Sequence, residues 1–147
     1  MASEQTSILI LDDEPIVSKR LKPSLEKKGY EVETFTSSAD ALKRVTERQF
    51  NIVITDLKMD GVDGMQFLTE VKEKYPDTEV IVITGFATMA TAKESFNKGG
   101  FDFLAKPFKL GEIAEVISRA EEKIKNKLMF GSTPSATLEA PEELKNN

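Results

Sequence analysis

The chain has 147 residues, of which 39% are hydrophobic and 31% charged, so it is long enough for one globular domain with a buried core. Its formal net charge of −5 argues against direct binding to nucleic acid or to an anionic membrane surface. It contains no Cys and no His, which excludes disulfides, thiol nucleophiles, Cys- or His-ligated zinc and a phosphohistidine within the chain. The groups left for its chemistry are carboxylates, Lys and hydroxyls, with a hard metal ion as an available cofactor.

The start of the sequence resembles neither an export signal nor a lipidation signal. The first residues lack the basic region and apolar core of a signal peptide, and Ala2 stands where myristoylation requires Gly. No apolar run approaches the length needed to cross a bilayer. We therefore expect a cytoplasmic protein that does not bind membranes.

The first elements are a buried strand and a helix. Residues 7–11 form an apolar run without alternation, which predicts a strand buried on both faces. A helix should follow, with Asp12 or Asp13 as its cap, and it should end before Gly29. Pro23 falls inside this helix and predicts either a kink or a displaced start.

The next strands differ in their patterns. Residues 30–35 alternate polar and apolar side chains, which predicts a half-exposed strand near a sheet edge. Ser37 or Ser38 can cap the helix that follows. Residues 51–56 form another apolar run, and it ends abruptly in a carboxylate, so we expect a second buried strand with an acid at its carboxyl end. A helix over about residues 65–74 comes next.

The second half continues the alternation of strands and helices. Residues 78–84 and 101–104 predict the fourth and fifth strands, with a helix over 89–97 between them. The last helix should run from about 110 to 128, because apolar residues recur there at spacings of three and four. Its apolar set consists of Ile113, Val116, Ile117, Ala120, Ile124 and Leu128.

Five strands alternating with five helices predict an α/β domain, with a parallel sheet covered by helices on both faces. Right-handed crossovers leave few arrangements, and the flavodoxin-like order 2-1-3-4-5 suits a chain of this length. We expect this domain to cover residues 7–128. Small and acidic residues follow, so residues 129–147 are expected to be a flexible tail.

This order brings acidic residues together at one edge of the sheet. Asp12 and Asp13 follow the first strand and Asp56 ends the third, while Thr84 and Lys106 lie at the same edge on the fourth and fifth strands. Two carboxylates ~4 Å apart repel each other by about 4 kcal/mol at an effective dielectric of ~20, so a proton or a cation must offset this repulsion. A site with only oxygen ligands suits Mg²⁺ or Mn²⁺.

A carboxylate beside such an ion and a Lys is equipped for phosphoryl transfer. The metal and the ammonium neutralise the phosphoryl oxygens while the carboxylate attacks phosphorus, and the product is an aspartyl phosphate. This product would place nearly two negative charges at the sheet edge. The hydroxyl of Thr84 is a donor that can move to meet them.

These segments resemble the receiver domain of bacterial two-component response regulators. The matching segments occur in the family's order within roughly residues 7–128. They are residues 10–14, 55–59, 84–85 and 106–108. Residues 85–88 together with 101–108 are similar to those of receivers that precede ATPase-type transcription activators.

The resemblance implies a role for each matching residue. Asp56 would be the phosphoacceptor, and it would bind Mg²⁺ together with Asp12, Asp13 and the backbone carbonyl of Lys58. Lys106 would hold the phosphoryl oxygens. A separate sensor histidine kinase would donate the phosphoryl group.

The resemblance also implies a switch. Thr84 would move its hydroxyl toward the phosphoryl group, and the aromatic ring of Phe103 would turn inward. This change would alter the face formed by the fourth helix, fifth strand and fifth helix, which would bind a downstream effector or a second copy of the chain. The Lys106–Pro107 peptide bond would be cis. Asp60 departs from the family, because many receivers have Pro there.

Each residue also has a plain structural interpretation, and two other functions remain open. The acidic pair after the first strand would cap a helix, and Phe103 would be part of the core. The chain would then be a phosphorylation-independent interaction module, but intact Asp56, Thr84 and Lys106 argue against this. A metal-dependent phosphatase acting on external substrates is the other alternative, and the short loops argue against it.

Overall fold

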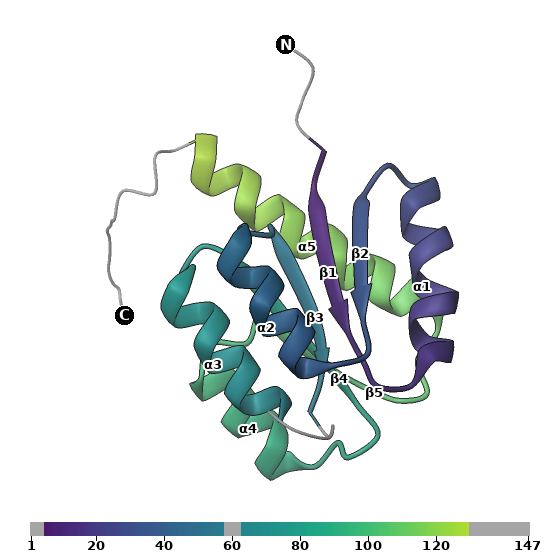
Figure 1. Ribbon diagram of the computed structural model, residues 1–147, viewed down its shortest axis with the longest axis vertical. Coiled ribbons are helices and arrows are strands. Elements are labelled where there is room, and N and C mark those ends of the chain that lie inside the picture. Colours follow the sequence, from purple (N-terminus) through teal and green to yellow (C-terminus); the bar gives the residue numbers. More distant parts are fainter. Residues whose placement is uncertain (1–4, 58–62, 130–147) are drawn as a thin grey trace, which may run out of the picture.

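The structure is a computed structural model that describes residues 5–57 and 63–129 (Figure 1). Five parallel strands form one sheet in the order β2-β1-β3-β4-β5, which confirms the predicted flavodoxin-like α/β fold. The strands are β1 (Ser7–Leu11), β2 (Glu31–Phe35), β3 (Ile52–Asp56), β4 (Glu79–Thr84) and β5 (Asp102–Ala105). The helices are α1 (Pro15–Lys27), α2 (Ser38–Glu47), α3 (Gly64–Lys74), α4 (Met89–Asn97) and α5 (Leu110–Met129).

Helices cover both faces of the sheet (Figure 1). Along β1, Ile8 and Ile10 pack with α1 and α5, whereas Leu9 and Leu11 pack with α2 and α3. All four side chains are fully buried, because successive residues of a strand point to opposite faces and both faces are covered. The uninterrupted apolar runs of the sequence therefore correspond to central strands.

The edge strand β2 has the alternating pattern expected of a half-exposed strand. Val32 is buried, and its neighbours are only partly buried. Glu33 forms a bidentate ion pair with Arg44 of α2, with N–O distances of 2.8 and 2.9 Å. These contacts fix α2 against an edge strand whose charged side chains face solvent.

Two local predictions about helices were wrong. The N-cap of α1 is Glu14, which makes no side-chain capping bond, because Pro15 occupies the first helical position and sets the start after the acidic pair. The start of α1 is not displaced toward Pro23, which lies inside the helix. Leu128 is 79% exposed rather than inward-facing, because the buried stripe of α5 ends with the partly buried Ile124.

None of the helices within the described ranges combines the length and apolar character that a bilayer crossing requires.

Candidate functional site

The carboxyl ends of the strands bring the predicted residues to one edge of the sheet. Asp56 is the last residue of β3, and Asp12 directly follows β1, the neighbouring strand. Both carboxylates are almost completely shielded from solvent. Thr84 is the last residue of β4 and is also buried, while Lys106 directly follows β5.

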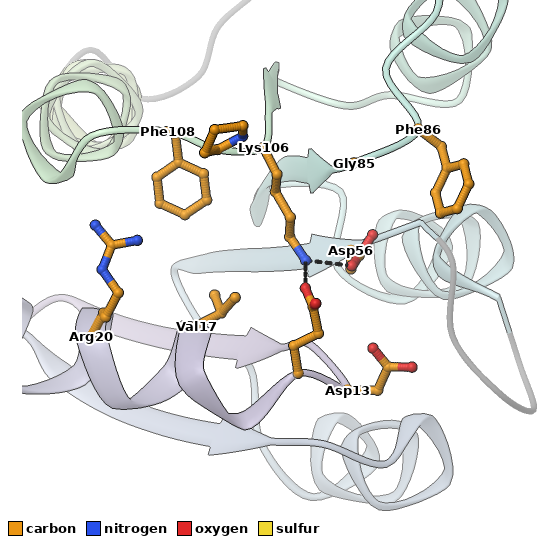
Figure 2. Close-up of a pocket in the computed structure, with 10 residues that line it drawn as sticks. Asp13, Val17, Arg20, Asp56, Gly85, Phe86, Lys106 and Phe108 are labelled. Atoms are coloured by element: carbon orange, nitrogen blue, oxygen red, sulfur yellow. Dashed lines mark hydrogen bonds and ion pairs between the residues drawn. The ribbon is translucent and has the colours of Figure 1, made fainter.

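Lys106 joins the acidic residues at this edge (Figure 2). Its Nζ atom lies 2.7 Å from Oδ2 of Asp12, 2.7 Å from Oδ2 of Asp56 and 2.7 Å from Oε1 of Glu14. Burial alone would lower the pKa of Lys106, but its contacts with these carboxylates raise it, so the ammonium is charged at neutral pH. The sequence did not reveal the role of Glu14. Its place in the loop after Asp12 is the one signal that could have done so.

Asp12 is the least compensated of these acids. Burial raises the pKa of its carboxyl above the ordinary 3.8, although Lys106 and the backbone N–H of Glu14 lower it. The Glu14 N–H donates to Oδ1 of Asp12 at 2.8 Å, whereas Oδ2 is buried without a hydrogen bond of good geometry and has only its ion pair with Lys106. A buried charge in this position favours the approach of a cation.

The donor set fits a hard divalent cation. Asp12, Asp13 and Asp56 each offer a carboxylate oxygen, and these oxygens lie within 4.8 Å of one another. Asp13 is exposed at the mouth of the site, so it is accessible to a hydrated ion. The single ammonium of Lys106 cannot balance three carboxylates and Glu14. The residues present therefore match an oxygen-ligated Mg²⁺ or Mn²⁺ site.

Gly64, the first residue of α3, lies very close to the backbone of the candidate acceptor. The N–H of Gly64 donates to the carbonyl of Leu57 at 2.9 Å, which folds the chain back onto the end of β3. A Cβ at position 64 would lie 1.8 Å from the carbonyl oxygen of Asp56 and 2.6 Å from Cα of Leu57. Only glycine allows this approach, so Gly64 is a further residue on which the site depends.

Thr84 and Phe103 occupy neighbouring strands on one face of the sheet. Phe103 pairs in register with Val82, and Thr84 lies two residues further along the strand on that face. The Thr84 hydroxyl accepts a hydrogen bond from the Phe86 N–H at 3.0 Å. The ring of Phe103 is partly buried and packs against the core beneath α2 and α3.

Backbone geometry after β5 positions Lys106. Its N–H donates to the carbonyl of Thr84 at 2.8 Å, and the Lys106–Pro107 peptide bond is cis, as the resemblance implies. A cavity of about 510 Å³ opens beside the ammonium. Figure 2 shows its two sides, with Asp13 and Asp56 on one and Arg20 and Phe108 on the other. Lys58, Asp60 and residues 130–147 lie outside the described residues.

Comparisons with a family model and with known proteins point to the same family. Residues 8–118 match the family described as the response regulator receiver domain. The chain is 32% identical over 121 residues to the C4-dicarboxylate transport transcriptional regulatory protein DctD of Rhizobium meliloti, covering 82% of this chain and 26% of that protein. It is 26% identical over 140 residues to the DNA-binding transcriptional regulator NtrC of Escherichia coli, covering 91% of this chain and 30% of that protein. The chain thus spans between a quarter and a third of these relatives.

Solved structures agree with this fold. A CheY-like receiver domain from Methanospirillum hungatei superposes with a TM-score of 0.81 at 26% identity, covering 84% of this chain and 99% of that one. A receiver domain from Clostridium thermocellum gives 0.76 at 34% identity, covering 85% and 98%. Receivers are signalling switches rather than enzymes that turn over an external substrate. The chain belongs to the response regulator receiver domain family, the phosphoacceptor module of two-component signal transduction.

Proposed function

We propose that Asp56 is the phosphoacceptor and that a sensor histidine kinase donates the phosphoryl group to it. The observation that carries this proposal is the contact of 2.7 Å between Lys106 Nζ and Asp56 Oδ2, beside the acidic oxygens of Asp12 and Asp13. An ammonium and a cation-binding pair next to one buried carboxylate form the arrangement that phosphoryl transfer needs.

Each residue of the site has a chemical role in this transfer. A carboxylate oxygen of Asp56 bonds to phosphorus as the bond from phosphorus to the donor breaks, and the donor leaves with the bonding electrons. Lys106 would exchange carboxylate partners for the phosphoryl oxygens, which the new group on Asp56 would place beside the ammonium. Asp12, Asp13, Asp56 and the carbonyl of Lys58 would hold Mg²⁺, or Mn²⁺ in its place. The bound ion supplies positive charge to the transferring phosphoryl group.

Thr84 and Phe103 would convert the modification into a change of surface. The Thr84 hydroxyl would donate to a phosphoryl oxygen, and the partly buried ring of Phe103 would fill the space that the hydroxyl leaves. Their shared face of the sheet supports this coupling. A shift from mostly inactive to mostly active requires a free-energy difference of about 5 kcal/mol between the two states.

The output face would be formed by α4, β5 and α5. Met89 is 87% exposed and Phe96 48% exposed on α4, and Leu110 at the start of α5 is 37% exposed. These exposed apolar side chains would give a protein partner apolar area to bury. We propose that this face binds a downstream effector protein or domain, or a second copy of the chain, and that nucleic acid and membranes are not bound directly.

The remaining assignments follow from this role. We propose that residues 7–128 are the receiver unit and that it works in the cytoplasm, where a kinase has access to ATP. Similarity to transcriptional regulators such as DctD supports an ATPase-type activator as the downstream component. A phosphorylation-independent module does not require the full set of Asp56, Thr84 and Lys106, and the short loops argue against a phosphatase acting on external substrates.

Intact-mass spectrometry tests the acceptor directly. The chain is incubated with acetyl phosphate and Mg²⁺, and we expect one phosphoryl adduct on the native protein. The Asp56→Asn variant should show no adduct, and a chelator should prevent its formation on the native protein. Acetyl phosphate leaves as acetate when the new bond to Asp56 forms.

Asp63→Asn is the matched control, because Asp63 caps α3 next to the site and Asn caps equally well. This variant should form the adduct as fast as the native chain. If the native chain forms no adduct with acetyl phosphate or with a histidine kinase, the phosphorylation-independent module replaces our proposal. Steady release of phosphate from an added phosphomonoester would instead favour the phosphatase.

A further inference from the structure

A chain of hydrogen bonds joins the end of β4 to the first turn of α4. We call it the threonine relay (Thr84, Phe86, Thr88 and Thr91). Oγ1 of Thr84 accepts from the Phe86 N–H, and the Phe86 carbonyl lies 3.0 Å from Oγ1 of Thr91. Thr88 and Thr91 form a reciprocal capping box, in which each side chain accepts from the other residue's N–H at 3.0 Å.

Thr91 holds the central position in the relay. Its hydroxyl has one proton and three acceptors within reach: the Phe86 carbonyl at 3.0 Å, and both the hydroxyl and the carbonyl of Thr88 at 3.1 Å. It can serve only one of them at a time. The bond to Phe86 ties α4 to the loop, whereas the other two stay within the cap. Thr91 is therefore placed to exchange one arrangement for the other.

The first turn of α4 depends on this cap more than on packing. The buried residue that α4 contributes is Ser95, in its second half. Met89, its first residue, is largely exposed. A short helix end without buried side chains is held mainly by the hydrogen bonds that satisfy its free N–H groups. A change in the relay would therefore alter this turn.

We propose that Thr91 couples the Thr84 hydroxyl to α4. This hydroxyl can donate its proton to a phosphoryl oxygen on Asp56 while it still accepts from the Phe86 N–H. Its movement then draws the Phe86 backbone along, and the Phe86 carbonyl parts from Thr91. The inference rests on the proposed function and extends it, because it assigns transmission of the signal to a residue of α4 outside the acceptor site. Thr91 is a positioning residue, since it touches no reacting atom.

Hydrogen–deuterium exchange of the α4 peptides tests this coupling. The native chain, Thr91→Val and Thr91→Ser are each measured with and without acetyl phosphate and Mg²⁺, and intact mass records the adduct. Val keeps the branched shape and removes the hydroxyl, whereas Ser keeps the hydroxyl. Thr46→Val is the matched control, because the Thr46 hydroxyl of α2 also donates to a carbonyl three residues earlier.

We expect Thr91→Val to form the adduct at the native rate within about twofold, because Thr91 lies outside the acceptor site. Its first turn of α4 should exchange about fivefold faster than in the native chain before phosphorylation, because the substitution removes the Thr91 half of the capping box and leaves the Thr88 half. Phosphorylation should then add little further change, and Thr91→Ser should behave as native.

Two results would overturn the coupling. In the first, the adduct forms and α4 of Thr91→Val responds to it as fully as α4 of the native chain. In the second, Thr46→Val alters α4 as much as Thr91→Val does. Absence of the adduct on the native chain is a separate result, which refutes the proposed acceptor and with it the coupling.

Discussion

Lys106 is shared among three carboxylates, and this sharing defines the unphosphorylated site. Its Nζ atom contacts two buried oxygens, on Asp12 and Asp56, and one exposed side chain, Glu14. Removal of any one contact leaves two others, so the ammonium stays in place while its partners change. A phosphoryl group on Asp56 would add negative charge where the ammonium already lies. The resting ion pairs thus orient Lys106 for the modified state.

The first prediction concerns the cost of the buried Asp12 charge. A raised carboxyl pKa means that the folded state holds this proton more tightly than the unfolded state. The contribution of Asp12 to the free energy of unfolding is therefore fully present below the ordinary pKa of 3.8, and it is lost as the pH rises through the raised pKa of the folded state. At neutral pH, Asp12→Asn should therefore stabilise the metal-free protein by about 1 kcal/mol, or roughly 4 °C in Tm.

Thermal unfolding at pH 7.5 in chelator measures this gain, which should shrink as the pH approaches 4. Mg²⁺ should raise the Tm of the native chain and have little effect on Asp12→Asn, because binding to the folded state stabilises it by mass action. Asp63→Asn should have the native Tm in chelator and the native response to Mg²⁺, because Asp63 is not among the proposed ligands. A lower Tm for Asp12→Asn at neutral pH would contradict the conclusion that burial raises the pKa of Asp12.

At the scale of elements, sequence patterns predicted most of the fold, because strands buried on both faces appear in the sequence as uninterrupted apolar runs. The predicted bounds of α4 agree with the structure, and both end glycines that follow helices, Gly29 and Gly99, have positive φ. The residues at the strand ends were predicted to lie together because the carboxyl ends of parallel strands meet at one edge of the sheet. The contact of Glu14 with Lys106 and the threonine relay could not be predicted, since they depend on how side chains of loops meet in space.

The second prediction concerns the turn from β3 into α3. Gly64→Ala places a Cβ against the backbone of Asp56 and Leu57, and rigid backbone cannot yield as a flexible side chain would. We expect a loss of about 3 kcal/mol or more in the free energy of unfolding, measured by urea denaturation. Phosphorylation by acetyl phosphate should also be slowed, because the displaced atoms belong to the acceptor residue.

Gly111→Ala is the control for this substitution. Gly111 lies in the first turn of α5, and a Cβ there would meet no atom within 4 Å. Alanine in a helix gains roughly 0.5–1 kcal/mol over glycine, so this variant should be slightly more stable than the native chain. Equal destabilisation by the two substitutions would show that the close approach at Gly64 does not decide the effect.

At the scale of the whole molecule, the acceptor edge and the proposed output face share β5, because Lys106 directly follows that strand. Helices α1, α2, α3 and α5 bury apolar stripes against the sheet. Within the described part of the chain, the one buried residue of α4 is Ser95, which is polar. Elements with few buried contacts are the ones that rearrange at low cost. The loosely held helix α4 follows β4 after residues 85–88, and β4 pairs with β3, which ends in Asp56, the proposed acceptor.

The third prediction follows from the separation between the acceptor edge and the proposed output face. The double variant Met89→Lys with Phe96→Ser removes the two most prominent apolar side chains of α4 and leaves the acceptor site untouched. Exposed positions contribute little to folding, so its Tm should change by no more than about 2 °C. Adduct formation with acetyl phosphate should match that of the native chain. Phosphorylation-dependent self-association, followed by sedimentation velocity with acetyl phosphate and Mg²⁺, should be at least tenfold weaker.

Ile16→Lys separates this effect from a general loss of surface hydrophobicity. Ile16 is 60% exposed on α1, outside the proposed output face. Only apolar side chains inside an interface contribute contact area to association. Ile16 lies outside the proposed face, so Ile16→Lys should self-associate as the native chain does. If Ile16→Lys abolishes association and the α4 double variant preserves it, the output face lies on α1. If the native chain stays monomeric when phosphorylated, self-association through this face is refuted, and only the binding of an effector is left as its proposed use.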